Sequence, residues 1–251
     1  MIKTKINIII GKFLESYFIE SLLKLFDRKN FINFKGSLIF VKDLDHKNYI
    51  RILFSYYESA EIKLMNKYFK PDIITIDIGS GIGATMCTFA QKAKKKIICI
   101  EASKFCINQL KINFKKNKLK NFVIINKLFF ARKNINNQKI TFKENKDFTH
   151  NKLIKDNTDT KKNITNNNAV TLNKIIKKFA LKHVQILCDI EGEEINFTKK
   201  DFEDFRLCQN LIIEIHTQNK VKINYLLKNF KMIASLQLVE RKNSVFYLKK
   251  F

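Results

Sequence analysis

The chain has 251 residues, 45% of them hydrophobic and 12% aromatic, and its 48 Lys and Arg against 23 Asp and Glu give a formal charge of +25. This composition excludes an intrinsically disordered chain, and the length suffices for one domain with a full core. No apolar run reaches membrane-spanning length and no secretory cleavage site follows the basic N-terminus, so we expect a cytoplasmic protein without a transmembrane segment.

The excess of lysine is a weak indication of a nucleic-acid partner. Lysine is spread along the whole chain together with abundant Ile, Asn and Phe and a single Pro, which is the usage that an AT-rich genome produces. We therefore attribute the charge to composition, although residues 91–120, with ten lysines against Glu101, leave a polyanionic partner open. The five cysteines form no CxxC pair and the four histidines are scattered, which predicts reduced core thiols and no metal centre.

The first elements are predicted to form an appendage over residues 1–50, ahead of a main domain at 51–251. Residues 6–26 carry apolar side chains at helical spacing. We expect this helix to pack on the main domain, with a dimer contact or a membrane surface as alternatives. Residues 31–42 are typical of a short hairpin with Gly36 near its turn.

The middle of the chain alternates strands and helices. A helix over 48–69 ends before Pro71. It is followed by strand, helix, strand, helix and strand at 73–77, 84–95, 97–101, 103–117 and 122–126. Alternation at this spacing predicts a parallel sheet with crossover helices.

A polar insertion interrupts this alternation at residues 133–168. It is Asn-rich and aperiodic after a short candidate strand at 139–144, so we expect a surface loop. Regular structure resumes with a helix, a strand, a helix, a strand, a helix and two closing strands, at 171–181, 183–190, 198–207, 210–216, 219–229, 231–239 and 243–251. The last two strands predict an antiparallel pair at the sheet edge.

The stretch DIGSGIG at 77–83 is the strongest candidate for a ligand site. A glycine turn between a strand and a helix lets a ligand approach unpaired backbone N–H groups, although a tight turn alone could also explain it. A dinucleotide and S-adenosylmethionine both use this geometry, with an acid such as Glu101 at the end of the next strand. Asp77 favours S-adenosylmethionine, because a carboxylate there would repel a pyrophosphate and attract an ammonium group.

Four blocks of the sequence resemble the FkbM-type family of S-adenosylmethionine-dependent methyltransferases, over about residues 50–250. They are the Tyr-Glu element with the glycine loop, a strand ending in Glu, a Val-Thr-Leu block, and CDIEGEE with a later Glu-x-His strand, at 57–83, 97–103, 170–176, 188–194 and 211–216. Ser80-Gly81, Ala102, Asn173 and Cys188 depart from the residues usual in that family.

The resemblance implies a class I methyltransferase fold: an α/β, Rossmann-like, mostly parallel seven-stranded sheet with helices on both faces and a C-terminal antiparallel pair. It implies S-adenosylmethionine as cofactor and a hydroxyl of a sugar or other small molecule as acceptor. The residues expected to bind the cofactor form the glycine loop, the end of the second strand and the Tyr57-Glu58 element, namely Asp77, Gly79, Ser80, Gly81, Gly83, Glu101, Ala102 and Glu58.

The fourth and fifth parallel strands end in ionisable residues that can do chemistry. Because ligands bind beyond the carboxyl ends of such strands, we expect Asp189 to act as general base, with His216 as second choice. Glu191 and Glu194 are weaker candidates for the substrate side, and Glu194 could instead cap the next helix. Together the carboxylates could also hold a divalent cation.

Three other functions stay open. The single proline, Pro71, is followed by Asp72, which excludes the Asn/Asp-Pro-Pro-aromatic and Pro-Cys motifs of base methylation but not ribose methylation of RNA. A hydride-transferring enzyme would use the same loop for NAD. A relative that binds the cofactor without turnover would keep the fold alone. The sequence does not indicate the oligomeric state.

Overall fold

The computed structural model describes residues 30–132, 140–143, 152–154, 163–164 and 169–251. The predicted helix at 6–26 and most of the polar insertion at 133–168 lie outside the described residues. None of the described helices is long and apolar enough to cross a membrane.

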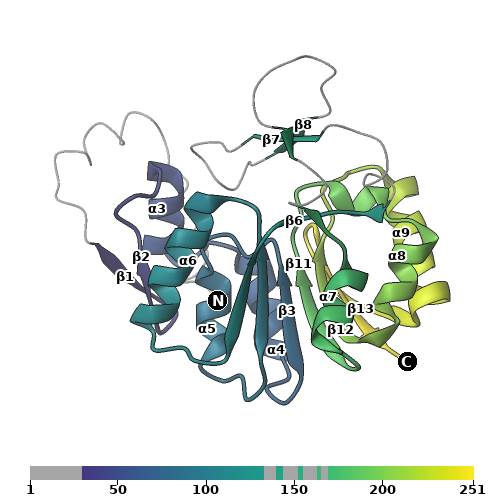
Figure 1. The fold of residues 1–251 in the computed structure, drawn as a ribbon, viewed down its shortest axis with the longest axis horizontal. Coiled ribbons are helices and arrows are strands. Elements are labelled where there is room, and N and C mark those ends of the chain that lie inside the picture. The colour runs from purple at the N-terminus through teal and green to yellow at the C-terminus, as the bar shows by residue number, and fades with distance from the viewer. Residues whose placement is uncertain (1–29, 133–139, 144–151, 155–162, 165–168) are drawn as a thin grey trace.

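A seven-stranded sheet forms the centre of the molecule (Figure 1). Its order is β13-β14-β12-β11-β3-β4-β5, and five neighbouring strands from β12 to β5 are parallel. β14 is antiparallel to both of its neighbours. The order confirms the expected class I methyltransferase sheet. The bounds are β3 Ile74–Ile78, β4 Ile97–Glu101, β5 Phe122–Asn126, β11 Val184–Cys188, β12 Cys208–Glu214, β13 Leu236–Lys242 and β14 Val245–Lys250.

Helices cover both faces of this sheet, because the parallel strands are apolar on both sides. One face carries α4 (Ser59–Tyr68), α5 (Ala84–Ala90) and α6 (Lys104–Lys116). The other carries α7 (Leu172–Phe179), α8 (Lys199–Asp204) and α9 (Lys220–Ala234).

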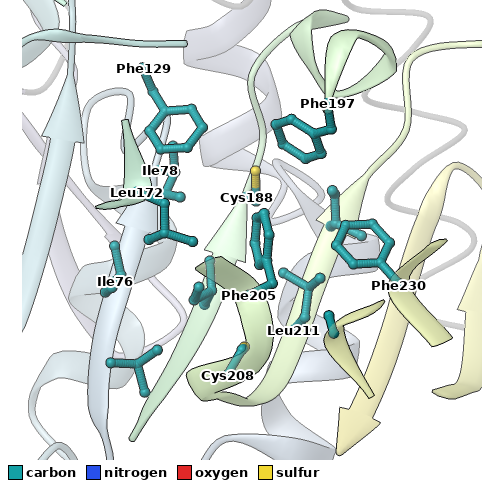
Figure 2. Close-up of a cluster of buried hydrophobic side chains, with 14 of the residues drawn as sticks. Ile76, Ile78, Phe129, Leu172, Cys188, Phe197, Phe205, Cys208, Leu211 and Phe230 are labelled. Atoms are coloured by element: carbon teal, nitrogen blue, oxygen red, sulfur yellow. The ribbon is translucent and has the colours of Figure 1, made fainter. Parts of the chain in front are cut away.

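Figure 2 shows the hydrophobic core on the face that α7, α8 and α9 cover. In it, Phe205 and Phe230 pack against Leu211 of β12. Ile76 and Ile78 of β3 belong to the same cluster. Each fully buried side chain of this kind stabilises the fold by about 1.5–3 kcal/mol. Cys188 and Cys208 lie in this core, and all five cysteines are buried and unpaired, as predicted.

The predicted hairpin is present as β1 (Phe31–Phe34) and β2 (Ser37–Phe40). It packs against α6, where Asn113 joins it to the glycine loop: Oδ1 accepts the N–H of Phe40 at 2.6 Å, and Nδ2 donates to the carbonyl of Ile82 at 2.8 Å. The hairpin therefore shares a core with α5 and α6.

Short strands complete the described fold. β6 (Leu128–Phe129) pairs in parallel with β10 (Ala169–Val170). β7 (Ile140–Lys143), which corresponds to the candidate strand at 139–144, pairs with β8 (Lys152–Ile154) and β9 (Asn163–Ile164).

The single helix expected over 48–69 is wrong, because the structure divides it into α3 (His46–Leu53) and α4. The N–H groups of Tyr56 and Tyr57 both donate to the carbonyl of Arg51, which closes α3. Glu58 then takes a left-handed conformation with φ 42°. This break turns Tyr57 inward, where it is 4% exposed.

Three other helices end three or more residues from the predicted position. α5 ends at Ala90 rather than 95, because the chain turns and the N–H of Lys94 donates to the carbonyl of Pro71. The helix expected over 198–207 ends at Asp204 and continues as a 3₁₀ turn, Phe205–Leu207. α9 runs on to Ala234 within the segment expected as a strand from 231, because Ala234 continues the buried stripe of Ile223, Leu226 and Phe230.

Candidate active site

The glycine loop lies between β3 and α5 and is tied to both neighbouring strands. Gly79 and Ser80 donate their N–H groups to the carbonyl of Ile100 in β4. Gly79 has φ +82°, and a Cβ built there would lie 1.7 Å from the carbonyl oxygen of Asp189, just beyond β11. This position therefore accepts only glycine, since any side chain would separate the loop from β11.

Glu101, at the end of β4, receives the loop from the other side. Its Oε2 accepts the N–H of Gly81 and its Oε1 accepts the N–H of Ser103, each at 2.8 Å. Two backbone donors fix the plane of this carboxylate.

A cavity of about 700 Å³ opens beyond the carboxyl ends of β3, β4, β11 and β12. The glycine loop and Glu101 line it where β3 and β4 end, which we call the first end, and Asp189, Glu191 and His216 line it beyond β11 and β12, which we call the second end. The wall carries six carboxyl groups against two basic side chains and one imidazole, from Glu58, Glu61, Glu101, Asp189, Glu191, Glu214, Arg51, Lys127 and His216. The chain as a whole carries a charge of +25, so the excess of acidic side chains in the cavity wall contrasts with the rest of the molecule.

The expected cofactor residues divide into two groups. Those that line the cavity are Glu58, Gly79, Gly81, Glu101 and Ala102. The rest lie behind the loop: the Oγ of Ser80 donates to the carbonyl of Asp77, and Gly83 packs against Leu110 and Phe114. Asp77 is 3% exposed, and burial raises its pKa to about 7.

Glu58 stands in the wall because of the break between α3 and α4. Its carboxylate accepts the hydroxyl of Thr85, which belongs to the first turn of α5. Burial raises the pKa of Glu58, and the hydrogen bonds from Thr85 and Tyr57 oppose that rise.

The other end of the cavity brings Asp189 and His216 together, as the sequence predicts for the ends of the fourth and fifth parallel strands. His216 Nε2 lies 3.4 Å from Asp189 Oδ1 and 3.6 Å from Glu191 Oε2. Burial and the neighbouring Glu214 and Glu191 raise the pKa of Asp189, whereas His216 lowers it. Burial lowers the pKa of His216, but the carboxylates of Glu194, Asp189 and Glu214 raise it to about 9.

Glu194 lies behind His216 rather than in the wall. It is completely buried, and its carboxylate accepts the backbone N–H groups of His216 and Gly192. It does not contact the cavity that a substrate would enter, so its expected place on the substrate side differs from the structure.

The structure adds acids that sequence reasoning did not select. Glu61 on α4 is 5% exposed and lines the cavity beside Glu214, and burial together with Glu58 and Glu214 raises its pKa to about 9. Glu214 Oε1 accepts the hydroxyl of Ser244 from the turn between β13 and β14 at 2.6 Å. Glu61 follows Glu58 by three residues, a spacing that would place both side chains on one face of a helix and so point to Glu61. The break at Glu58 hides this relation in the sequence.

One set of side chains in the described part has the spacing of a cation site. Single ligand atoms of Asp189, Glu214 and His216 lie within 4.8 Å of one another. This set differs from the carboxylates Asp189, Glu191 and Glu194 considered from the sequence, because Glu194 is turned away from the cavity.

Comparisons with known proteins support no more than a general resemblance. No protein-family model and no curated protein sequence matches the chain. Solved structures that are similar include an rRNA methylase from Streptococcus thermophilus, at 9% identity over 76% of this chain and 94% of that chain, with a TM-score of 0.44. Another is TYW2 from M. jannaschii in complex with AdoMet, at 15% identity over 89% and 85%, with a TM-score of 0.42.

A third similar structure is a precorrin-6y C5,15-methyltransferase from Geobacter metallireducens, at 12% identity over 77% of this chain and 88% of that chain, with a TM-score of 0.43. These names span different methyl acceptors. With TM-scores below 0.5, none of these similarities identifies the acceptor of this chain. The resemblance to the FkbM-type family stays a prediction from the four sequence blocks.

Proposed function

We propose that the chain is an S-adenosylmethionine-dependent methyltransferase that methylates a hydroxyl group of a small molecule or sugar, as the FkbM-type resemblance implies. One observation carries the proposal. A single cavity has the glycine loop and Glu101 at one end and the Asp189–His216 pair at the other. The five buried, unpaired cysteines support the cytoplasmic location expected for such an enzyme.

The residues at the first end fit this cofactor. Gly79 and Gly81 present bare backbone to the cavity, and the fixed carboxylate of Glu101 offers acceptors for ribose hydroxyls. Buried Asp77, in the ionised form that it adopts above its pKa of about 7, adds negative potential behind the loop, which favours a ligand with an ammonium and a sulfonium group. When bound, S-adenosylmethionine supplies a methyl group that is already activated for displacement.

The residues at the second end would handle the acceptor. Because the donor is activated, placing the acceptor oxygen in line provides much of the catalysis. Asp189 then takes the hydroxyl proton as the new oxygen–carbon bond forms, so that the products are a methyl ether and a neutral thioether. His216 beside it compensates the negative charge of Asp189.

The acidity of the wall supports a neutral or cationic acceptor. Glu58, Glu61, Asp189, Glu191 and Glu214 all line the cavity. A phosphate group would be repelled by those of them that are ionised, which weighs against an RNA backbone as the group that fills the cavity.

Calorimetric titration with S-adenosylmethionine and its demethylated product tests the cofactor. We expect wild-type protein to bind both, and Glu101→Ala to bind at least about tenfold more weakly because two ribose hydrogen bonds are lost. Asp72→Ala is the matched control, since it removes a 68% exposed carboxylate before β3, away from the cavity. Absence of binding would overturn the proposal, and tight binding of NAD alone would replace it with hydride transfer.

Acceptor screening with labelled methyl donor tests the reaction. Methylation of a sugar or small-molecule hydroxyl is expected, and bound cofactor without transfer to any acceptor would indicate a non-catalytic relative. The dense lysines of residues 91–120 favour ribose methylation of RNA as the second candidate. Methyl transfer to RNA, with an affinity that falls steeply as salt rises, would establish that candidate instead.

A further inference from the structure

Glu194 is a charged side chain without access to solvent. It belongs to the 3₁₀ helix Glu193–Asn196 and is 0% exposed. Oε2 accepts the N–H of Gly192 at 3.0 Å, while Oε1 accepts the backbone N–H of His216 and lies 3.5 Å from its ring Nδ1. A buried carboxylate is costly unless it is hydrogen-bonded and paired with a cation, and the ion pair that Glu194 makes within the described residues is with His216.

The opposite edge of the same imidazole faces the cavity. Nε2 lies 3.4 Å from Asp189 Oδ1. That oxygen is buried, and no donor in the described part of the chain makes a hydrogen bond to it. The ring nitrogen is therefore the group that can neutralise Asp189, and the imidazole lies between Glu194 on one side and Asp189 on the other.

We propose that Glu194 is a positioning residue that orients the His216 ring with Nε2 toward Asp189, and thereby favours the ionised form of Asp189 as the base for the acceptor hydroxyl. The inference rests on the proposed function. It assigns Glu194 a role that acts through His216, without contact with either substrate. A carboxylate behind an imidazole fixes which ring nitrogen faces the reacting group.

The charges around His216 determine the direction of the effect. Glu194 faces it from the 3₁₀ helix, Asp189 and Glu191 from the segment after β11, and Glu214 from the end of β12. Replacing the carboxylate of Glu194 with an amide removes one of the charges that raise the pKa of His216. A less protonated His216 then lowers the pKa of Asp189 less, so the pKa of His216 falls while that of Asp189 rises.

Glu193 provides the matched control. It is also buried, at 3% exposure, and it also accepts from a backbone N–H, that of Ala131 at 3.2 Å, and from a side-chain amide, that of Asn196 at 2.9 Å. Glu193→Gln therefore perturbs the same 3₁₀ helix without changing the charge beside His216 Nδ1.

The primary test is an NMR titration of the His216 imidazole, assigned by its loss in His216→Gln. In the wild type we expect a midpoint near 9. In Glu194→Gln we expect it to fall by about one pH unit or more, and in Glu193→Gln to stay unchanged. The pH profile of kcat should narrow in Glu194→Gln alone, with the acidic limb moving up and the alkaline limb moving down, while the Kd for S-adenosylmethionine stays within about twofold.

An unchanged His216 midpoint in folded Glu194→Gln would overturn the inference, and so would equal shifts in the two Gln variants. Should Glu194→Gln fail to fold, the wild-type titration decides: a midpoint below about 6.5, the ordinary value, would overturn it. Failure of the proposed function gives a different result, namely no calorimetric binding of the cofactor with the titration of His216 as expected.

Discussion

The two ends of the cavity are built in different ways. At the glycine loop, backbone groups do the positioning: Gly79, Ser80 and Gly81 donate to β4, and one carboxylate, Glu101, fixes the loop. At the other end, the cavity is lined by ionisable side chains from the segment after β11 and from the end of β12, and Ser244 of the β13–β14 turn donates its hydroxyl to Glu214. The first end is held mainly by backbone groups, whereas the contacts of the second end change with every proton that it gains or loses.

This difference implies a division of labour. An end built from backbone hydrogen bonds suits a ligand that is the same in every turnover. An end built from coupled acids and an imidazole suits a group whose proton must be removed. Substitutions should therefore separate affinity for the cofactor from turnover, and each prediction below tests that separation.

Asp189→Asn should have the largest effect at the second end alone. It removes the proposed base while keeping the shape of the side chain, so turnover should fall by about 10²- to 10⁴-fold. Calorimetry should give a Kd for S-adenosylmethionine within about threefold of the wild type. Unchanged turnover would remove Asp189 as the base, and an equal loss of affinity would show that the two ends are not independent.

Gly79→Ala should lower both the stability of the fold and the affinity for the cofactor. The new Cβ would lie 1.7 Å from the carbonyl oxygen of Asp189, so loop and β11 must separate. We expect a loss of about 3 kcal/mol of unfolding free energy, or a Tm roughly 6–12 °C lower by calorimetry, together with weaker cofactor binding.

Gly36→Ala is the matched control for this substitution. Gly36 has φ +90°, and nothing lies within 4 Å of its added Cβ. It carries the backbone strain without the collision and should lose only about 1–2 kcal/mol. Equal destabilisation of the two variants would contradict the close approach of the loop to β11.

Glu61→Gln should have the smallest effect, seen as a change in how stability depends on pH. The folded pKa of Glu61, about 9, exceeds the ordinary value of 4.5, so the folded state retains a proton that the unfolded state releases. Its contribution is complete below about pH 4.5 and is lost as pH rises toward 9. Denaturant unfolding at pH 5 and pH 8.5 should show Glu61→Gln gaining stability relative to the wild type as pH rises, because only the wild type carries this loss. A constant difference would mean that Glu61 ionises normally.

The same contrast explains what the sequence could predict. Each parallel strand is a short apolar run, and the motif that holds Gly79, Gly81 and Glu101 is contiguous with two such strands, so local pattern identified this end. Glu61 was not identified because the break at Glu58 interrupts the predicted helix, and the contact of Glu58 with Thr85 joins residues 27 apart in the sequence. Glu194 was expected to face the substrate, and its real partner, His216, lies beyond the end of β12, 22 residues further along the chain.

The position of β14 has a consequence for synthesis of the chain. β14 leaves the ribosome after β13 but is inserted between β13 and β12, so the sheet cannot grow in the order of translation. Until residues 245–250 emerge, β12 has an unpaired edge and Glu214 lacks the hydroxyl of Ser244. A nascent chain stalled before that point therefore has a complete glycine loop but an unfinished catalytic end, and it carries an exposed strand that invites chaperones or aggregation.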